Sequence, residues 1–96
     1  MMTVNVKFVG ALRHIADKSD MIIECPVDFS VKELLQKIIL YLPEIKTNIV
    51  NQQTGNVVKT NVLILVNDRE ISVLNGMDTL LNSGDEVVFI PVVHGG

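Results

Sequence analysis

One amphipathic helix is the feature of this sequence that most limits the folds available to it. Ser30 is followed three residues later by Glu33, the spacing of a capping box at a helix start, and Pro43 marks the helix end. Between them, apolar residues recur at helical spacing on one face: Val31, Leu34, Leu35, Ile38 and Leu42. A single stripe of this width covers one face of a sheet but cannot form a helical bundle by itself. The helix therefore predicts a sheet as its packing partner.

Two strands are predicted before this helix. Residues 3–9 alternate between polar and apolar side chains, the period-two pattern of a strand with one buried face. A polar connection runs through residues 17–20, and the apolar segment 21–25 ends at Pro26. Because the connection is short, we expect the two strands to pair antiparallel.

The remaining strands are predicted after the helix. We expect an apolar strand at 62–66, a short return strand at 69–73 beyond a turn at Asn67-Asp68, and a last strand at 86–91. If the helix returns the chain beside the first strand, the two terminal strands lie together in the centre of the sheet. A structureless segment 43–61 would be unusually long, so we expect a short hairpin or an ordered excursion there, packed by Ile49, Val50, Val57 and Val58.

This order of elements predicts one α+β domain, a mixed four- to five-stranded sheet with one main helix packed on one face. The chain has 96 residues, of which 48% are hydrophobic, enough for one core without disulfides or metal. Cys25 is the only cysteine, so no internal disulfide can form. With only two histidines, His14 and His94, the chain lacks the ligand sets of structural zinc and iron–sulfur centres. We therefore expect no metal site.

Charge and hydropathy exclude two classes of partner. The net charge is −3, and the C-terminal third is acidic, with Arg69 as its only basic side chain. Nucleic acid binding needs clustered Lys and Arg, so we expect no nucleic acid partner. These acidic side chains are suited to binding a basic protein surface; the alternative is that they only solvate the turns and keep the domain in solution. The longest apolar run, 87–93, is far shorter than the roughly 20 residues of a spanning helix, and no signal peptide opens the chain. We expect a soluble, cytoplasmic protein with no membrane partner.

The face of the sheet away from the helix offers a candidate docking surface. If Glu86 faces water, alternation places Val88 and Ile90 on the same outer side, and the polar residues bounding 62–66 place Leu63 and Leu65 there too. Should the two strands be neighbours, these four residues form an exposed apolar patch ringed by acids, as in a partner interface. The alternative is that segment 43–61 covers the patch.

The C-terminal sequence is the candidate reactive site. The chain ends Pro91-Val92-Val93-His94-Gly95-Gly96, and glycines can run extended through a slot too narrow for other residues. The carboxylate of Gly96 is a poor electrophile and must be activated, most plausibly as an acyl-adenylate. The chain has no phosphate-binding Gly-rich loop and no nucleophile–base pair, so activation must come from a partner. A cloning scar or a truncation would also produce this ending.

Several motifs together resemble one family. They are Val6-Lys7-Phe8, Ala11-Leu12-Arg13, Val31-Lys32-Glu33-Leu34-Leu35, Leu65-Val66-Asn67-Asp68-Arg69-Glu70-Ile71, Leu74-Asn75-Gly76-Met77-Asp78-Thr79, Ser83-Gly84-Asp85-Glu86-Val87 and the terminal Gly95-Gly96. In this order they resemble the ubiquitin-like β-grasp sulfur carriers, the family of the molybdopterin synthase small subunit (MoaD) and the thiamine sulfur carrier (ThiS). The resemblance covers nearly the whole chain except 43–61. It implies a β-grasp domain at 1–91 and a flexible tail at 92–96.

The resemblance also implies a function. A ubiquitin-activating-type enzyme, similar to MoeB or ThiF, would use ATP to adenylate Gly96, and a persulfide donor would convert the adenylate to a thiocarboxylate. The chain itself would bind no cofactor and hold no catalytic side chain, as the sulfur-donating subunit of a sulfurtransferase complex. In the molybdopterin branch, which the length favours, the tail residues Pro91 to Gly96 insert into the large synthase subunit (MoaE), and the sulfur builds the cofactor dithiolene. The family docks its partners through the sheet surface and the tail.

Two departures from the family pattern leave alternatives open. Val92 stands where the family commonly has a second proline, and His94 where it has a small residue. The His-Gly-Gly ending is similar to the ubiquitin-related modifier Urm1, which carries sulfur for tRNA thiolation and is conjugated to lysines of target proteins. A modifier of this kind, or a small archaeal modifier, is the alternative function. A third hypothesis is a β-grasp binding module whose Gly-Gly has no role. For His94 itself, a solvated residue in the tail is the simpler interpretation.

Overall fold

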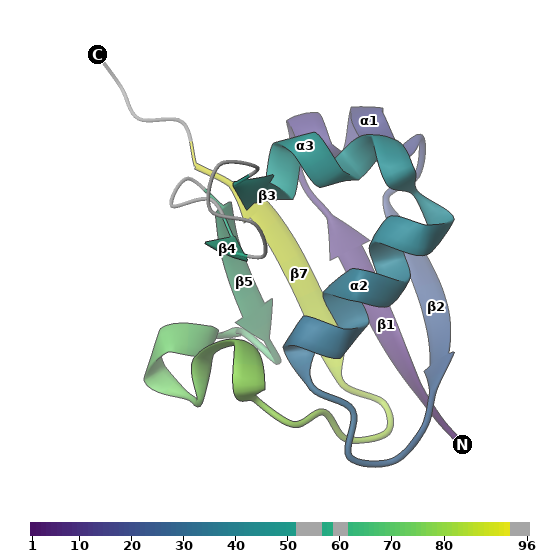
Figure 1. Ribbon diagram of the computed structural model, residues 1–96, viewed down its shortest axis with the longest axis vertical. Coiled ribbons are helices and arrows are strands. Elements are labelled where there is room, and N and C mark those ends of the chain that lie inside the picture. Colours follow the sequence, from purple (N-terminus) through teal and green to yellow (C-terminus); the bar gives the residue numbers. More distant parts are fainter. Residues whose placement is uncertain (52–56, 59–61, 93–96) are drawn as a thin grey trace.

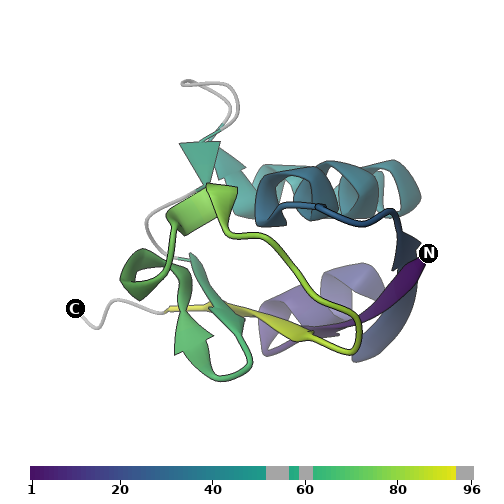
Figure 2. The ribbon, with the colours of Figure 1, turned by 90° about the horizontal axis from the view of Figure 1, so that it is seen from below.

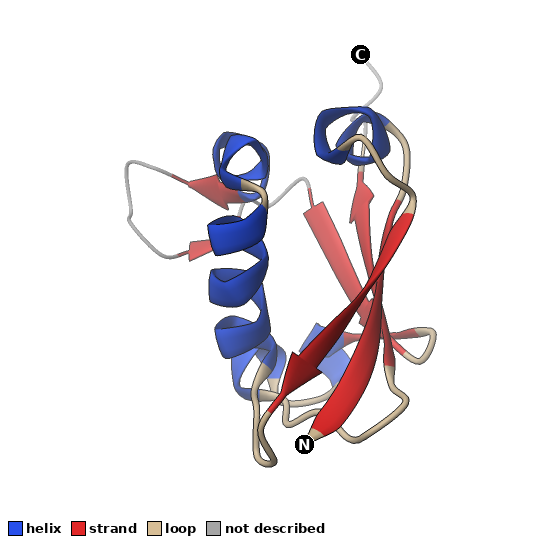
Figure 3. Ribbon diagram, turned by 90° about the vertical axis from the view of Figure 1, so that its right-hand side faces the viewer, coloured by secondary structure: helices blue, strands red, loops and turns tan. Residues whose placement is uncertain are grey.

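The computed structural model describes residues 1–51, 57–58 and 62–92, and it contains a mixed sheet with its main helix on one face (Figures 1 and 3). The sheet has five strands in the order β2-β1-β7-β5-β6. Their bounds are Met2–Phe8 (β1), Asp20–Cys25 (β2), Val62–Val66 (β5), Arg69–Glu70 (β6) and Glu86–Pro91 (β7). The α+β prediction with a four- to five-stranded mixed sheet is confirmed.

The two terminal strands lie side by side in the middle of the sheet, as expected. β1 and β7 pair parallel, with Asn5 opposite Glu86 and Phe8 opposite Phe89. The last of these pairs lies on the inner face, where the two rings stack with their centroids 5.9 Å apart. β2 pairs antiparallel with β1, and β5 pairs antiparallel with β7. Residues from opposite ends of the chain therefore become neighbours at the sheet centre.

The main helix, α2 (Val31–Tyr41), covers the inner face of the sheet (Figures 2 and 3). Its predicted capping box is present: Glu33 N–H donates to Ser30 Oγ, and Ser30 N–H donates to the Glu33 carboxylate, each at 3.1 Å. All five residues of the predicted stripe are buried: Val31, Leu34, Leu35, Ile38 and Leu42. A fully buried aliphatic side chain contributes about 1.5–3 kcal/mol, so this stripe is the principal tie between helix and sheet.

A short helix, α1 (Ala11–Ala16), lies where the sequence predicts only a polar connection between the first two strands. Leu12 and Ala16 are buried in the core, and α1 packs against the 3-10 turn η1 (Pro43–Ile45) at one end of the sheet (Figure 1). With six residues and no side-chain cap, α1 depends on these tertiary contacts rather than on local signals.

The segment after α2 forms an ordered excursion on the helix side of the sheet (Figure 3). It comprises η1, the short helix α3 (Lys46–Ile49), and a two-stranded hairpin of β3 (Val50–Asn51) and β4 (Val57–Val58). The hairpin expected in 43–61 is thus confirmed for its described residues. Ile45, Ile49 and Val50 are buried in the core cluster. The packing expected of Val57 and Val58 lies outside the described side chains.

The return strand predicted at 69–73 is shorter than expected. β6 contains only Arg69 and Glu70, and the 3-10 turns η2 (Ile71–Val73) and η3 (Gly76–Asp78) follow. The Glu70 carboxylate accepts hydrogen bonds from Ser72 N–H at 2.7 Å and Ser72 Oγ at 2.6 Å. This local bonding competes with a strand ladder and turns the chain toward the core. In the described part of the chain, no helix has the length and apolarity needed to cross a membrane.

Candidate functional site

The structure brings the four predicted docking residues together on the outer face of the sheet. In the β5–β7 register, Leu63 lies opposite Ile90 and Leu65 lies opposite Val88. The alternate residues of both strands are buried under the helices: Val62, Ile64, Val66, Val87 and Phe89. The alternation inferred from the polar residues that bound these strands is therefore correct. We call Leu63, Leu65, Val88 and Ile90 the outer patch.

The members of the outer patch differ in exposure. Leu63 is 38% exposed, Leu65 and Ile90 are half-buried, and Val88 is only 9% exposed. Val88 lies between Leu65 of β5 and Lys7 of β1, its partner in the parallel register. Leu63 and Ile90 are thus the more accessible pair. The described residues of 43–61 lie on the opposite face and do not cover the outer patch (Figure 3). Residues 52–56 and 59–61, on which the alternative of a covered patch also depends, lie outside the described residues.

Val9 extends this apolar surface and was missed in the sequence analysis. It follows directly after β1 and is 43% exposed. Its N–H donates to Phe89 O at 3.2 Å, which continues the parallel ladder and places Val9 beside Ile90. The alternation of residues 3–9 could have found it, because Val9 shares the parity of the exposed Asn5 and Lys7.

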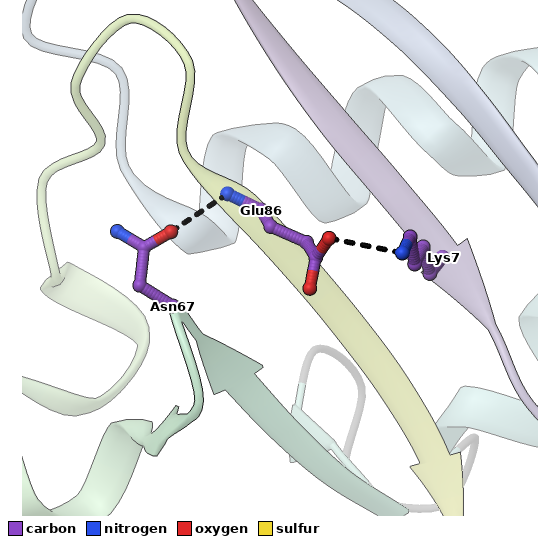
Figure 4. A network of polar contacts seen from close by, with 3 residues as sticks. All are labelled: Lys7, Asn67 and Glu86. Carbon is purple, nitrogen blue, oxygen red and sulfur yellow. Dashed lines mark hydrogen bonds and ion pairs between the residues drawn. The ribbon is translucent and has the colours of Figure 1, made fainter.

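Charged groups border the outer patch at the start of β7. Lys7 Nζ forms an ion pair with Glu86 Oε2 at 3.0 Å, and the hydrogen bond with this carboxylate raises the pKa of Lys7 (Figure 4). Glu70 lies opposite Leu65 on the other side. Of the acids predicted around the patch, Glu70 and Glu86 thus border its end at Leu65 and Val88, and Glu86 is paired with Lys7.

Asn67 fixes the end of β5 that lies beside Glu86. Its side-chain oxygen accepts from Glu86 N–H at 3.0 Å (Figure 4). Its amide group donates to Asp85 Oδ1 at 2.9 Å. Asn67 and Asp68 both have positive φ, 50° and 69°, as a two-residue hairpin turn requires. The predicted turn therefore also sets the register of the two strands that carry the outer patch.

The candidate tail leaves the sheet at the end of β7. Pro91 is opposite Val62, and Pro91 and Val92 are half-buried. Gly10 packs against Pro91 so closely that a Cβ atom at Gly10 would lie 3.3 Å from Pro91 Cγ. The predicted tail residues Val93, His94, Gly95 and Gly96 lie outside the described residues. The accessible end of the outer patch, at Leu63 and Ile90, is thus adjacent to the point where the tail begins.

Outside the outer patch and the tail, Cys25 is the remaining candidate reactive side chain that the described residues place in the core. Cys25 is buried in the core, and burial raises the pKa of its thiol. Over residues 1–51, 57–58 and 62–92, no group of three or more His, Cys, Asp or Glu side chains could hold a metal ion.

Comparison with known proteins assigns the family. The model of the family Urm1 (Ubiquitin related modifier) matches residues 3–96. The chain belongs to this family. Ubiquitin-related modifier 1 homolog 1 of Arabidopsis thaliana is 30% identical to it over 109 residues, which cover 99% of this chain and 100% of that protein.

Solved structures agree with the Urm1 assignment. The solution structure of Urm1 from Trypanosoma brucei superimposes with a TM-score of 0.79 at 29% identity, covering 98% of this chain and 95% of that one. The small archaeal modifier protein 1 from Methanosarcina acetivorans gives 0.86 at 27% identity, with coverages of 100% and 98%. The β-grasp fold expected from the resemblance is confirmed, within the superfamily of MoaD, ThiS and the small archaeal modifiers.

These findings correct the order of the two functional hypotheses. The resemblance and the chain length favoured the molybdopterin branch, whereas the family match and the curated relatives favour the ubiquitin-related modifiers. A large subunit of molybdopterin synthase is not supported as a partner. The His-Gly-Gly ending pointed to Urm1. Chain length was the misleading signal, because the chain spans 95% of the Trypanosoma brucei Urm1 structure and also 100% of a putative molybdopterin converting factor subunit 1 from Pyrococcus furiosus.

Proposed function

We propose that this Urm1-family chain is a ubiquitin-related modifier and sulfur carrier that acts in the cytoplasm through the carboxylate of Gly96. Its support is the family match over residues 3–96, which includes the terminal Gly95-Gly96. The thiocarboxylate supplies sulfur for tRNA thiolation, and the activated carboxylate is also joined to lysines of target proteins.

The chemistry requires no catalytic side chain of this domain. A carboxylate oxygen of Gly96 attacks the α-phosphate of ATP, pyrophosphate leaves, and an acyl-adenylate forms. A persulfide sulfur then attacks the carbonyl carbon and AMP leaves, and reduction of the resulting acyl disulfide by a thiol releases the thiocarboxylate. For conjugation, a lysine amine attacks the activated carbonyl carbon instead. An E1-like activating enzyme, the partner implied by the family, binds the ATP.

The geometry supports a shared docking site for such a partner. Two residues of the outer patch, Val88 and Ile90, lie on β7, the tail follows this strand directly, and Gly10 packs against Pro91 where the tail begins. A partner surface that covers Leu63 and Ile90 is therefore positioned to receive Pro91, Val92, Val93, His94, Gly95 and Gly96 in a narrow slot. Because the Gly10–Pro91 contact holds the residue from which the tail starts, less conformational entropy is lost when a partner binds there.

Intact-mass spectrometry tests the proposal. The purified chain is incubated with an E1-like enzyme, ATP and a sulfur source, and we expect one oxygen of the terminal carboxylate to be replaced by sulfur. A variant lacking Gly96 is the control, because it keeps the described fold but moves the carboxylate; it should gain no sulfur. Gly-Gly remnants on lysines of cellular proteins test conjugation. Equal activity of the Gly96-deleted variant in both assays would overturn the proposal.

A further inference from the structure

The outer edge of β2 presents unpaired backbone groups. β2 is the last strand on its side of the sheet, and Phe8 N–H donates to Ser19 O at 2.8 Å at the start of the β1–β2 ladder. Because hydrogen bonding alternates along an antiparallel pair, the backbone groups of Asp20, Ile22 and Glu24 point away from β1. Among the described residues, the contact made to these groups is that of Lys37 Nζ with Glu24 O.

A groove runs beside this edge, between β2 and α2. It has a volume of about 560 Å³. Met21, Ile23, Tyr41 and Leu42 supply the apolar part of its lining, and Lys18, Glu24 and Lys37 supply the charged part. Figure 3 shows the edge of β2 toward the viewer, with α2 beside it. A strand edge of six residues next to a groove with apolar side chains in its lining is an arrangement that accepts an added strand.

The side chains of β2 specify the strand that fits. Asp20, Ile22 and Glu24 lie on the outer face, and Ile22 is 71% exposed. In an added antiparallel strand, alternate residues lie opposite these three, and the residues between them face the groove. Charge complementarity favours basic residues opposite Asp20 and Glu24. The three positions between them face Ile22 or the groove, so apolar residues fit there.

We propose that the β2 edge binds an extended segment of a partner protein with the pattern basic, apolar, apolar, apolar, basic. The segment adds a sixth strand beside Asp20–Cys25 and places two apolar side chains in the groove. Its residue opposite Ile22 exchanges backbone hydrogen bonds with that residue, which are the main source of affinity in strand addition.

A second copy of the chain fits this edge less well. Antiparallel pairing of two β2 strands about Ile22 places Asp20 opposite Glu24 of the other copy, twice. Like charges directly opposite one another destabilise a strand pair. A partner with basic ends is therefore the occupant that the charges favour.

This surface is separate from the outer patch and does not rest on the proposed function. The polar residues Asn5, Lys7 and Glu86 lie between Ile22 and the residues of β5. A partner bound at the β2 edge consequently leaves Leu63 and Ile90 free.

NMR titration of the full chain with synthetic peptides tests the proposal. The probe is Gly-Ser-Lys-Val-Ile-Val-Lys-Ser-Gly, and the controls replace both Lys by Glu or the central Ile by Pro, which lacks the N–H. We expect the amide signals of Asp20, Ile22 and Glu24 to shift with the first peptide and slowed exchange of Ile22 N–H. Each control peptide should bind about tenfold more weakly or not at all.

Variants of the protein make the test specific. Glu24→Lys should weaken binding of the basic peptide about fivefold to tenfold and strengthen binding of the Glu peptide. Asp78→Lys, which makes the same change of charge on η3, should alter the affinity of neither peptide. Both positions are exposed, so both variants should fold. Shifts confined to Leu63, Leu65 and Ile90, equal binding of all three peptides, or self-association through β2 would each overturn the proposal.

Discussion

Gly10 and Pro91 are in such close contact that a Cβ atom at Gly10 would lie 3.3 Å from Pro91 Cγ, tighter than ordinary van der Waals packing. Gly10 has φ 62° and ψ −134°, a conformation essentially restricted to glycine. The loop after β1 thus holds the residue at which the tail leaves the sheet. Gly10 follows β1 and Pro91 ends β7. The two residues are far apart in the sequence and meet because these strands pair parallel.

Gly10→Ala should destabilise the fold by about 1–3 kcal/mol and reduce activation of Gly96, because it strains the backbone and displaces Pro91. Gly76→Ala is the matched control: φ is 59° at Gly76, but a Cβ there meets no atom within 4 Å. It should cost about 1–2 kcal/mol and leave activation unchanged. Urea unfolding and the mass assay measure the two effects. Equal activation of the two variants would contradict a role of the contact in tail direction.

Leu63→Glu tests the outer patch. The side chain is exposed enough for the fold to survive, with a loss of about 1–2 kcal/mol of stability from the apolar area no longer buried. We expect kcat/KM of the activating enzyme to fall about tenfold or more, as for a central interface residue. Val73→Glu introduces the same charge at an exposed residue of η2 and should leave kcat/KM unchanged. A folded Leu63→Glu variant with normal activation would remove the patch from the docking site.

Asn67→Gly separates the hydrogen bonds of Asn67 from its backbone conformation. Glycine accepts the positive φ but loses the bonds to Asp85 and Glu86, so we expect a loss of about 1–3 kcal/mol in urea unfolding. Asp68→Gly, at the neighbouring positive φ of the turn, should lie within about 0.5 kcal/mol of the parent. Similar losses for both variants would show that the turn conformation alone fixes the register.

Cys25 should be unreactive in the folded protein. Its side chain is buried, and burial raises the pKa of the thiol, so little thiolate is present or accessible at neutral pH. Alkylation by iodoacetamide should be slow in buffer and fast in denaturant, measured by intact mass, with Cys25→Ser as the unlabelled control. Comparable rates in the two conditions would contradict this prediction.

The hydrogen bonds between Glu70 and Ser72 should depend on pH. Hydrogen bonds from Ser72 Oγ and then Ser72 N–H lower the pKa of its carboxyl group. Because the pKa of Glu70 is lower in the folded protein than in the unfolded chain, the ionised carboxylate stabilises the fold at pH values above the ordinary glutamate pKa of about 4.3. This stabilisation is lost as the pH falls through the pKa of the folded state. The Ser72 amide resonance should therefore titrate below that value, and Ser72→Ala should raise the midpoint of the Glu70 carboxyl signal. A midpoint at the ordinary value in the parent would contradict the assignment.

Elements with complete local signals could be predicted from the sequence. The capping box of Ser30 and Glu33 and the stripe that follows define α2, and the apolar run after the turn at 82–85 defines β7 with its correct bounds. Helix α1 could not be found in this way, because its formation depends on burial of Leu12 and Ala16 in a core built from distant segments. β6 ended early because the carboxylate of Glu70 bonds to Ser72 instead of extending the ladder.

The sequence by itself determined which side chains of each strand share a face, since alternation is a local property of an extended chain. It placed Leu63 with Leu65, and Val88 with Ile90, and it carried the Gly-Gly ending on which the proposed function rests. Only the tertiary structure decided that β5 lies beside β7 in the register that makes these pairs one patch, and that Gly10 meets Pro91. Strand order and register depend on burying one common core, which joins residues that no local pattern connects.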